Sequence, residues 1–129
     1  KDGYAIQYAI KKGYPVAIIT GGVSKGVEVR YSGLGVKDVY MGSKDKIADF
    51  EDFLAKTNLN EDSIMYMGDD LPDYEVMKRV GLAVCPFDAA HEIKDICLYT
   101  SNRKGGEACV RDVIEQVMRS QDTWEITGW

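Results

Sequence analysis

The residues best suited to chemistry are three acids that follow an apolar run. Asp69, Asp70 and Asp73 come after the run 64–67 and one glycine. Clustered carboxylate oxygens are the hard ligands that Mg²⁺ prefers, and their mutual repulsion favours a bound cation. The competing interpretation is an Asp-rich turn that caps a helix beginning near Leu71, which is a common use of Asp. The loop is therefore a candidate metal site.

A candidate phosphate contact precedes the acidic loop. Thr20 follows the apolar run 16–19, and Gly21 and Gly22 follow it. This sequence offers an anion a hydroxyl and exposed backbone N–H groups that can be approached closely. An ordinary turn from strand to helix, with Thr as the cap, is the alternative.

Lys46 lies at the beginning of a predicted helix, where the helix dipole disfavours a cation. This placement indicates an anionic partner, such as a phosphoryl group in transfer, although a solvated surface lysine is the alternative. Lys46 also has a place in an ordered series. Thr20, Lys46 and Asp69 each follow a successive predicted strand, and this order is harder to obtain by chance than any one residue.

Short apolar strands and helices must alternate along the chain to position these residues. Strands are predicted over 16–19, 36–40, 64–67, 82–85 and 96–100, and helices over 4–12, 23–32, the segment after Ser43, 71–80 and 107–119. This alternation predicts an α/β fold, namely a doubly wound, Rossmann-like parallel sheet with helices on both faces. In such sheets the ligand site lies beyond the carboxyl ends of the strands, so the three groups should converge there.

Composition limits the class of protein. The 129 residues, 45% hydrophobic and 29% charged, suit one compact domain over 1–129. The apolar runs are far shorter than the ~20 residues that span a bilayer, so no membrane partner is expected. The net charge of -5 argues against nucleic acid but permits a phosphorylated small molecule held by local cations. Three widely spaced cysteines fit neither a disulfide framework nor a zinc site and indicate a cytoplasmic protein.

Four segments resemble motifs of the haloacid dehalogenase superfamily, namely 18–21, 41–46, 68–73 and 76–82. The similarity is greatest to the capless branch that hydrolyses 3-deoxy-manno-octulosonate 8-phosphate in lipopolysaccharide biosynthesis. The resemblance implies an Mg²⁺-dependent phosphatase that works through an aspartyl-phosphate intermediate. It also implies that Asp69 ligates Mg²⁺ directly, while Asp70 and Asp73 orient the metal or its waters.

The same resemblance implies how the substrate is held. Thr20, with Gly21 and Gly22, would bind the phosphoryl group, and Lys46 would neutralise its charge. Members of this branch are typically homotetramers in which a neighbouring subunit helps to close each active site. Arg30 thus becomes a candidate for reaching the sugar acid across an interface, and a plain surface arginine is the alternative.

The sequence departs from the family pattern in three places. By the resemblance, the family nucleophile lies in an Asp-x-Asp-Gly motif after the first strand, and no such motif precedes Lys1. That strand is central, between the strands ending at Thr20 and Asp69, and its loss would leave two apolar edges unpaired. We therefore expect a further segment of roughly 30 to 40 residues, one strand and a flap, in the working protein. Gly22 replaces a charged residue that helps relatives to select substrate, and Ala108 replaces a common glycine.

Rival functions are separated by motif order and by chemistry. A receiver-type signalling domain also uses acids, a Thr and a Lys, but its acids come first, whereas Asp69 follows both. We therefore exclude that class. A non-catalytic assembly protein of the same fold stays open, as does a phosphatase for a nine-carbon sialic-type acid 9-phosphate.

Three remaining features have weaker interpretations. His91 has no serine or cysteine nucleophile in a recognisable setting nearby, so we do not expect it to be catalytic. The glycine-rich segment 104–107 is either a plain loop or a segment that closes over a ligand. Trp124 and Trp129 in a polar tail indicate docking against a neighbouring surface or subunit.

Overall fold

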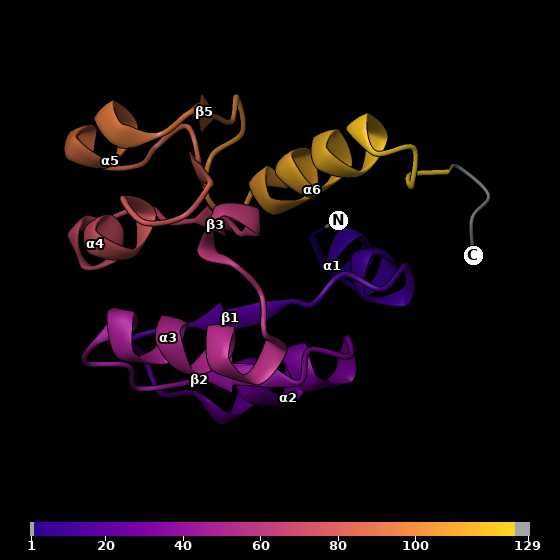
Figure 1. The fold of residues 1–129 in the computed structure, drawn as a ribbon, viewed down its shortest axis with the longest axis horizontal. Coiled ribbons are helices and arrows are strands. Elements are labelled where there is room, and N and C mark those ends of the chain that lie inside the picture. The colour runs from indigo at the N-terminus through magenta and orange to yellow at the C-terminus, as the bar shows by residue number, and fades with distance from the viewer. Residues whose placement is uncertain (1, 126–129) are drawn as a thin grey trace.

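The computed structural model describes residues 2–125, in which helices and strands alternate (Figure 1). The helices are α1 (Asp2–Lys11), α2 (Lys25–Gly33), α3 (Lys46–Thr57), α4 (Tyr74–Met77), α5 (His91–Ile96) and α6 (Cys109–Ser120). The strands are β1 (Ala17–Ile19), β2 (Asp38–Tyr40), β3 (Met65–Met67), β4 (Leu82–Cys85) and β5 (Tyr99–Thr100). Short 3-10 turns cover Glu61–Ser63 and Leu71–Asp73.

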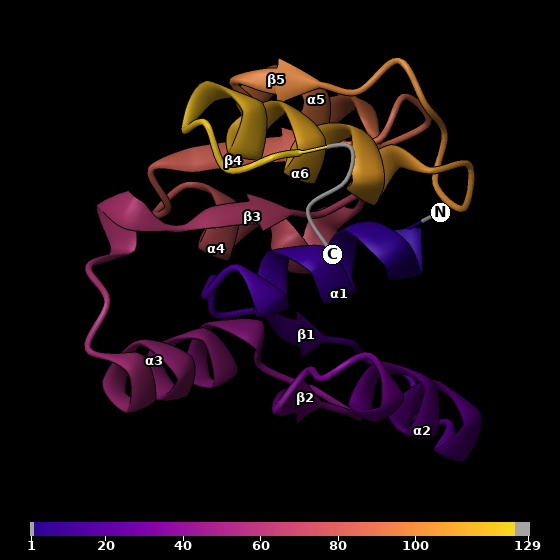
Figure 2. The ribbon, with the colours of Figure 1, turned by 90° about the vertical axis from the view of Figure 1, so that its right-hand side faces the viewer.

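The strands form two parallel sheets. β1 pairs with β2, and Ile18 lies opposite Val39. The second sheet has the order β3-β4-β5, and Tyr66 lies opposite Ala83. Figure 2 shows the order β5, β4, β3, β1, β2 from top to bottom. The predicted α/β class with parallel strands is confirmed.

β1 and β3 are neighbours in this order, yet within the described part of the chain they do not pair with each other. The edge of β1 and the edge of β3 that face each other therefore lack a strand partner among residues 2–125. This is the position at which the family pattern places one more, central strand. A further strand between β1 and β3 stays a prediction, which the separation of the two sheets leaves room for.

Helices cover the strands from both sides, with α1 and α6 on one side and α4 and α5 on the other (Figure 1). α1 packs against α6 through the buried residues Tyr8, Ala9 and Met118. The ring of Trp124 joins this contact, with its centroid 4.9 Å from that of Tyr8. Trp124 thus docks on α1 of its own chain, whereas Trp129 lies outside the described residues.

The second sheet has its own apolar core. Buried side chains from α4, β4, α5 and the loop before α5 meet there, namely Met77, Ala83, Cys85, Ala89 and Ile93. α3 (Lys46–Thr57), which lies in the segment after Ser43 where a helix was predicted, buries Phe50 and Phe53. Among residues 2–125, no helix has the length and apolar character needed to cross a bilayer.

The segment 71–80 differs from its prediction as one helix. It contains the 3-10 turn Leu71–Asp73 and the single-turn helix α4. The cause lies in the side chains of Asp70 and Asp73, which form a reciprocal capping box around the turn. Asp73 is therefore withdrawn from solvent and becomes a fixed part of the loop.

Candidate active site

The acidic loop folds around the carboxylate of Asp73. Gly68 turns the chain so tightly that a Cβ atom at this position would lie 2.5 Å from Cβ of Asp73. Oδ2 of Asp73 accepts hydrogen bonds from the backbone N–H groups of Asp69 at 3.1 Å and Asp70 at 3.4 Å. Oδ1 of Asp70 accepts from the N–H of Leu71 at 2.8 Å. The capping role considered from the sequence is thus filled by Asp70 and Asp73.

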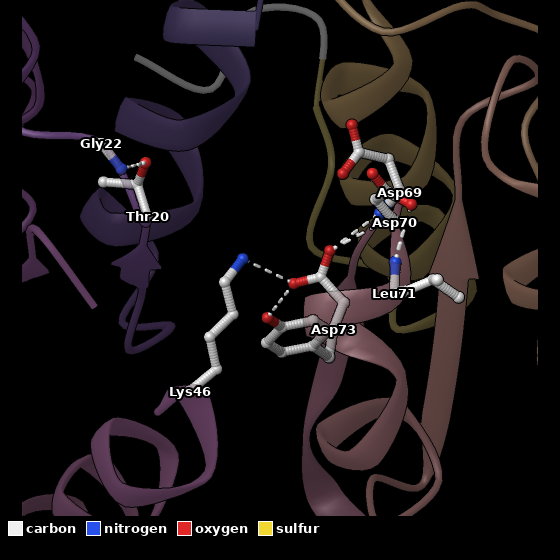
Figure 3. A network of polar contacts seen from close by, with 8 residues as sticks. Thr20, Gly22, Lys46, Asp69, Asp70, Leu71 and Asp73 are labelled. Carbon is white, nitrogen blue, oxygen red and sulfur yellow. Dashed lines mark hydrogen bonds and ion pairs between the residues drawn. The ribbon is translucent and has the colours of Figure 1, made fainter. Parts of the chain in front are cut away.

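Lys46 reaches this loop from α3. Its Nζ donates to Oδ1 of Asp73 at 2.8 Å, and the hydroxyl of Tyr66 donates to the same oxygen at 2.6 Å (Figure 3). Asp73 is buried, with 3% of its surface exposed. Burial alone would raise the pKa of Asp73, but the hydrogen bonds from Lys46 and Tyr66 outweigh it and hold that pKa below its usual value. Asp73 is therefore an anion that fixes the position of the Lys46 ammonium group.

The pKa of Asp69 is shifted in the direction opposite to that of Asp73. Partial desolvation, followed by the charges of Asp73 and Asp70, raises the pKa of the Asp69 carboxyl. Figure 3 shows its carboxylate directed away from Asp73. A carboxylate destabilised by neighbouring acids gains from a cation, and hard oxygen donors suit Mg²⁺. The residues of this loop therefore fit a magnesium ion.

The acidic loop can supply part of such a metal site. Within residues 2–125, no three Asp, Glu, His or Cys side chains are gathered as a complete metal site. Asp73 is occupied by Lys46 and Tyr66, so Asp69 and Asp70 are the acids of the loop that remain for a metal. The remaining ligands would come from water, from substrate or from another segment.

The loop after β1 is fixed to the loop after β2 by backbone hydrogen bonds. The N–H of Ser43 donates to the carbonyl of Thr20 at 2.9 Å, and the N–H of Gly42 donates to the carbonyl of Gly22 at 2.9 Å. Oγ1 of Thr20 accepts from the N–H of Gly22 at 3.3 Å. The Thr20 hydroxyl and the glycine N–H groups therefore lie on a braced turn that leads toward α3.

The N-terminus of α3 positions Lys46. Asp45 is the N-cap, and its Oδ1 accepts from the N–H groups of Ile47 at 3.1 Å and Ala48 at 3.3 Å. Lys46 is the first residue of the helix, as predicted. The anionic partner expected from this placement is present, since Asp73 lies within hydrogen-bond distance.

Sequence reasoning missed two polar residues at this site. Tyr66, on β3, shares the buried carboxylate of Asp73, and burial followed by that hydrogen bond raises its pKa. A tyrosine in an apolar strand just before an acidic loop was the available signal. The expected cap of the helix after Ser43 was Ser43 or a neighbour, and it is Asp45. Oγ of Ser43 is buried and has no hydrogen-bond partner among residues 2–125.

Arg30 and His91 lie apart from the group formed by Lys46 and the acidic loop. Arg30, on α2, lies over the ring of Tyr31 and lines a cavity beside α6. His91 is largely exposed and faces Asp95 one turn along α5. The structure thus brings Lys46 to Asp73 and the acidic loop, and leaves Arg30 in the wall of a cavity that the acidic loop does not line.

A family model of haloacid dehalogenase-like hydrolases matches residues 23–111, which is more than half of the chain. This chain belongs to the haloacid dehalogenase-like hydrolases. Within the family it is similar to the 3-deoxy-D-manno-octulosonate 8-phosphate phosphatase KdsC of Yersinia pestis, with 37% identity over 125 residues. That match covers 97% of this chain and 67% of the relative.

Solved structures give the same placement in the family. The crystal structure of the Yersinia pestis phosphatase superposes with a TM-score of 0.93 at 37% identity, over 95% of this chain and 66% of that one. The phosphatase from Moraxella catarrhalis, solved with magnesium, phosphate and KDO, has a TM-score of 0.90 at 28% identity. That match covers 94% of this chain and 70% of the relative. The chain therefore spans about two thirds of the length of these relatives.

Proposed function

We propose that this haloacid dehalogenase-like chain forms most of an Mg²⁺-dependent phosphatase that hydrolyses 3-deoxy-D-manno-octulosonate 8-phosphate. The products would be the free sugar acid and phosphate, for use in lipopolysaccharide synthesis. The observation that carries the proposal is the Lys46 ammonium group, which Asp73 holds beside the acidic loop. Support also comes from relatives that are named for this activity, one of which was solved with magnesium, phosphate and KDO.

The nucleophile would be an Asp on a further strand between β1 and β3. The support is that each of these strands has a free edge and that they do not pair with each other among the described residues. Such an Asp would attack phosphorus and release the sugar-acid hydroxyl, giving an aspartyl phosphate. Water would then hydrolyse this acyl phosphate, returning the free Asp and inorganic phosphate.

The residues of this chain would bind the phosphoryl group and balance its charge. The Thr20 hydroxyl and the N–H group of Gly21 would donate hydrogen bonds to phosphoryl oxygens, and the N–H of Gly22 would do so on exchanging Oγ1 of Thr20 for a phosphoryl oxygen. The Lys46 ammonium would offset the negative charge that spreads over these oxygens in the transition state. Asp69 and Asp70 would hold Mg²⁺, which supplies further positive charge next to the same oxygens.

Asp73 would act through Lys46 and not by contact with substrate. Its carboxylate holds the lysine ammonium at 2.8 Å and is itself held by two backbone N–H groups. This makes Asp73 a positioning residue. From the sequence, Asp73 was counted among the catalytic residues, as a group that orients the metal or its waters. Its burial and its contact with Lys46 favour a role in positioning that lysine.

At the level of the whole protein, we propose one phosphatase domain that includes residues 1–129 and assembles as a cytoplasmic homotetramer. Arg30 would contact the sugar acid of the substrate, which fits its position in the wall of a cavity away from the acidic loop. No nucleic acid or membrane partner is proposed.

The test is release of inorganic phosphate from 3-deoxy-D-manno-octulosonate 8-phosphate by the complete protein with Mg²⁺. Asp69→Ala should abolish it, while Asp95→Ala, which changes an exposed acid on α5, should not. A nine-carbon sialic-type acid 9-phosphate is assayed in parallel, because Gly22 replaces the charged residue that relatives use in selection. A higher kcat/KM for that substrate would transfer the assignment to it. No phosphate release from either would favour a non-catalytic assembly protein.

A further inference from the structure

The cavity that Arg30 lines lies between α1, α2, α6 and the glycine-rich segment before α6. Its volume is about 950 Å³, within the ~300–1,000 Å³ typical of ligand sites. None of the residues proposed to bind the phosphoryl group or the metal lines it. The charged side chains in its wall are the arginines 30, 103 and 111 and the acids 2, 107, 112 and 115.

Most of the acids in this wall are already engaged. Oδ1 of Asp2 accepts from the backbone N–H of Arg111 at 3.0 Å. Asp112 accepts hydrogen bonds from two hydroxyls and one amide group. Glu115 pairs with Arg111 at 3.4 Å, and the guanidinium of Arg111 also lies over the ring of Tyr4. Arg111 and these three acids therefore have partners within the chain.

The cavity wall also holds three charged side chains that are not paired in this way, namely Arg30, Arg103 and Glu107. None of the three forms an ion pair with a side chain among residues 2–125. The charge of Arg103 helps to lower the pKa of Asp112, but no ion pair joins the two side chains. The wall of the cavity thus presents two guanidinium groups and one carboxylate that are available to a ligand.

The loop that carries Arg103 is connected to the acidic loop. The N–H of Gly105 donates to Oδ1 of Asp88 at 2.8 Å. Two residues further along, the N–H of Ala90 donates to the carbonyl of Asp69 at 2.8 Å. The segment 86–90 therefore contacts both loops, so the Arg103 side of the cavity is one loop away from the candidate metal ligands.

We propose that this cavity binds a polyhydroxylated carboxylate, with Arg103 and Arg30 holding its carboxylate and Glu107 accepting from its hydroxyls. Guanidinium groups match a carboxylate through paired N–H donors. A free carboxylate such as that of Glu107 accepts from sugar hydroxyls and repels a second anionic group. This inference rests on the proposed function, because the ligand would be the sugar-acid end of the substrate. Arg103 would then determine specificity for an acid over a neutral sugar.

The experiment uses the complete protein and compares Arg103→Gln with Arg119→Gln. Arg119 lies on the exposed surface of α6 and does not itself line the cavity. Its partner Glu115, in the wall, keeps Arg111 as a second partner, so Arg119→Gln controls for the loss of one arginine. Kinetics are measured on the sugar-acid phosphate and on p-nitrophenyl phosphate, which has no carboxylate. Binding of the sugar acid without phosphate is measured by calorimetry.

Arg103→Gln should raise KM for the sugar-acid phosphate about tenfold with kcat nearly unchanged, and should weaken binding of the free sugar acid similarly. Hydrolysis of p-nitrophenyl phosphate and all properties of Arg119→Gln should match the unsubstituted protein. Unchanged KM and binding in Arg103→Gln would overturn the proposal, and so would an equal loss on both substrates. A protein without phosphatase activity would refute the proposed function, while calorimetry would still decide the cavity.

Discussion

Nζ of Lys46 lies 2.8 Å from Oδ1 of Asp73, and this contact joins the two halves of the molecule at their carboxyl edges. Lys46 begins the helix that follows β2, in the two-stranded sheet, whereas Asp73 belongs to the loop after β3, in the three-stranded sheet. Both side chains are largely buried, with 16% and 5% of their surfaces exposed. The pair therefore holds a cation of one sheet against the acidic loop of the other.

Lys46→Met should destabilise the fold by about 3 kcal/mol, because it leaves the Asp73 carboxylate buried without its cation. Lys56→Met is the matched control, since Lys56 is exposed and its pair with Asp38 should contribute little to stability. Both are measured by urea unfolding. A double-mutant cycle with Asp73→Asn should give a coupling of about 1–3 kcal/mol. Equal losses in the two lysine variants would contradict this account.

Asp69→Asn should make the metal-free protein slightly more stable at pH 7. The pKa of Asp69 is higher in the folded protein than in the unfolded chain, where it is about 3.9. The protonated Asp69 therefore favours folding below the unfolded pKa, and this stabilisation is lost as pH rises through the folded-state pKa. Removing the Asp69 charge should raise the free energy of unfolding by a few tenths to about 1 kcal/mol. The gain is small because the side chain is partly solvated. Mg²⁺ should raise the Tm of the unsubstituted protein but not of the variant. A destabilised variant in metal-free buffer would refute this.

Gly68→Ala should disrupt the acidic loop. The added methyl group would lie 2.5 Å from Cβ of Asp73 and 2.7 Å from Sδ of Met77, so the loop must move. We expect a loss of about 1–3 kcal/mol from overpacking and weaker Mg²⁺ binding. Gly33→Ala on α2 is the control, because a methyl group there meets nothing within 4 Å. Thermal unfolding with and without Mg²⁺ measures both effects, and similar behaviour of the two variants would argue against a tight loop.

The Asp112 network should contribute to stability only above acidic pH. Burial would raise the Asp112 pKa, but hydrogen bonds from Ser101, Gln116 and Tyr99 lower it overall. Its contribution is therefore present above the unfolded value of about 3.9 and is lost as pH falls through the folded value. Asp112→Asn should cost about 1 kcal/mol at pH 7. Urea unfolding from pH 7 to 3 should show this difference shrinking below about pH 4, and a constant difference would be inconsistent with a depressed pKa.

The sequence was informative where local pattern determines structure. Short apolar runs predicted the strands, and the parallel arrangement followed from the helices between them. The order of Thr20, Lys46 and Asp69 after successive strands predicted residues at the carboxyl edges of the sheets. The anionic partner of Lys46 was also predicted, because a cation at a helix N-terminus is otherwise unfavourable.

Other features depend on contacts between distant segments and have no local signal. The partner of Lys46 is 27 residues away, and nothing in the pattern of the acids distinguished buried Asp73 from Asp69. The division of segment 71–80 arises from a side-chain capping box. The docking of Trp124 on Tyr8 joins opposite ends of the described chain.

The contact of α1 with α6 also affects how the molecule folds. The hydroxyl of Tyr8 accepts from the N–H of Glu125 across a sequence separation of 117 residues, and Asp2 and Arg111 are joined across 109. Bringing such distant segments together closes a very long loop, whose entropy must be lost before the contact stabilises anything. The βα units can form from near neighbours along the chain. Docking of α1 on α6 is therefore expected late in folding. The backbone N–H groups of α1 should be among the first to exchange with solvent, because α1 separates from α6 early in unfolding.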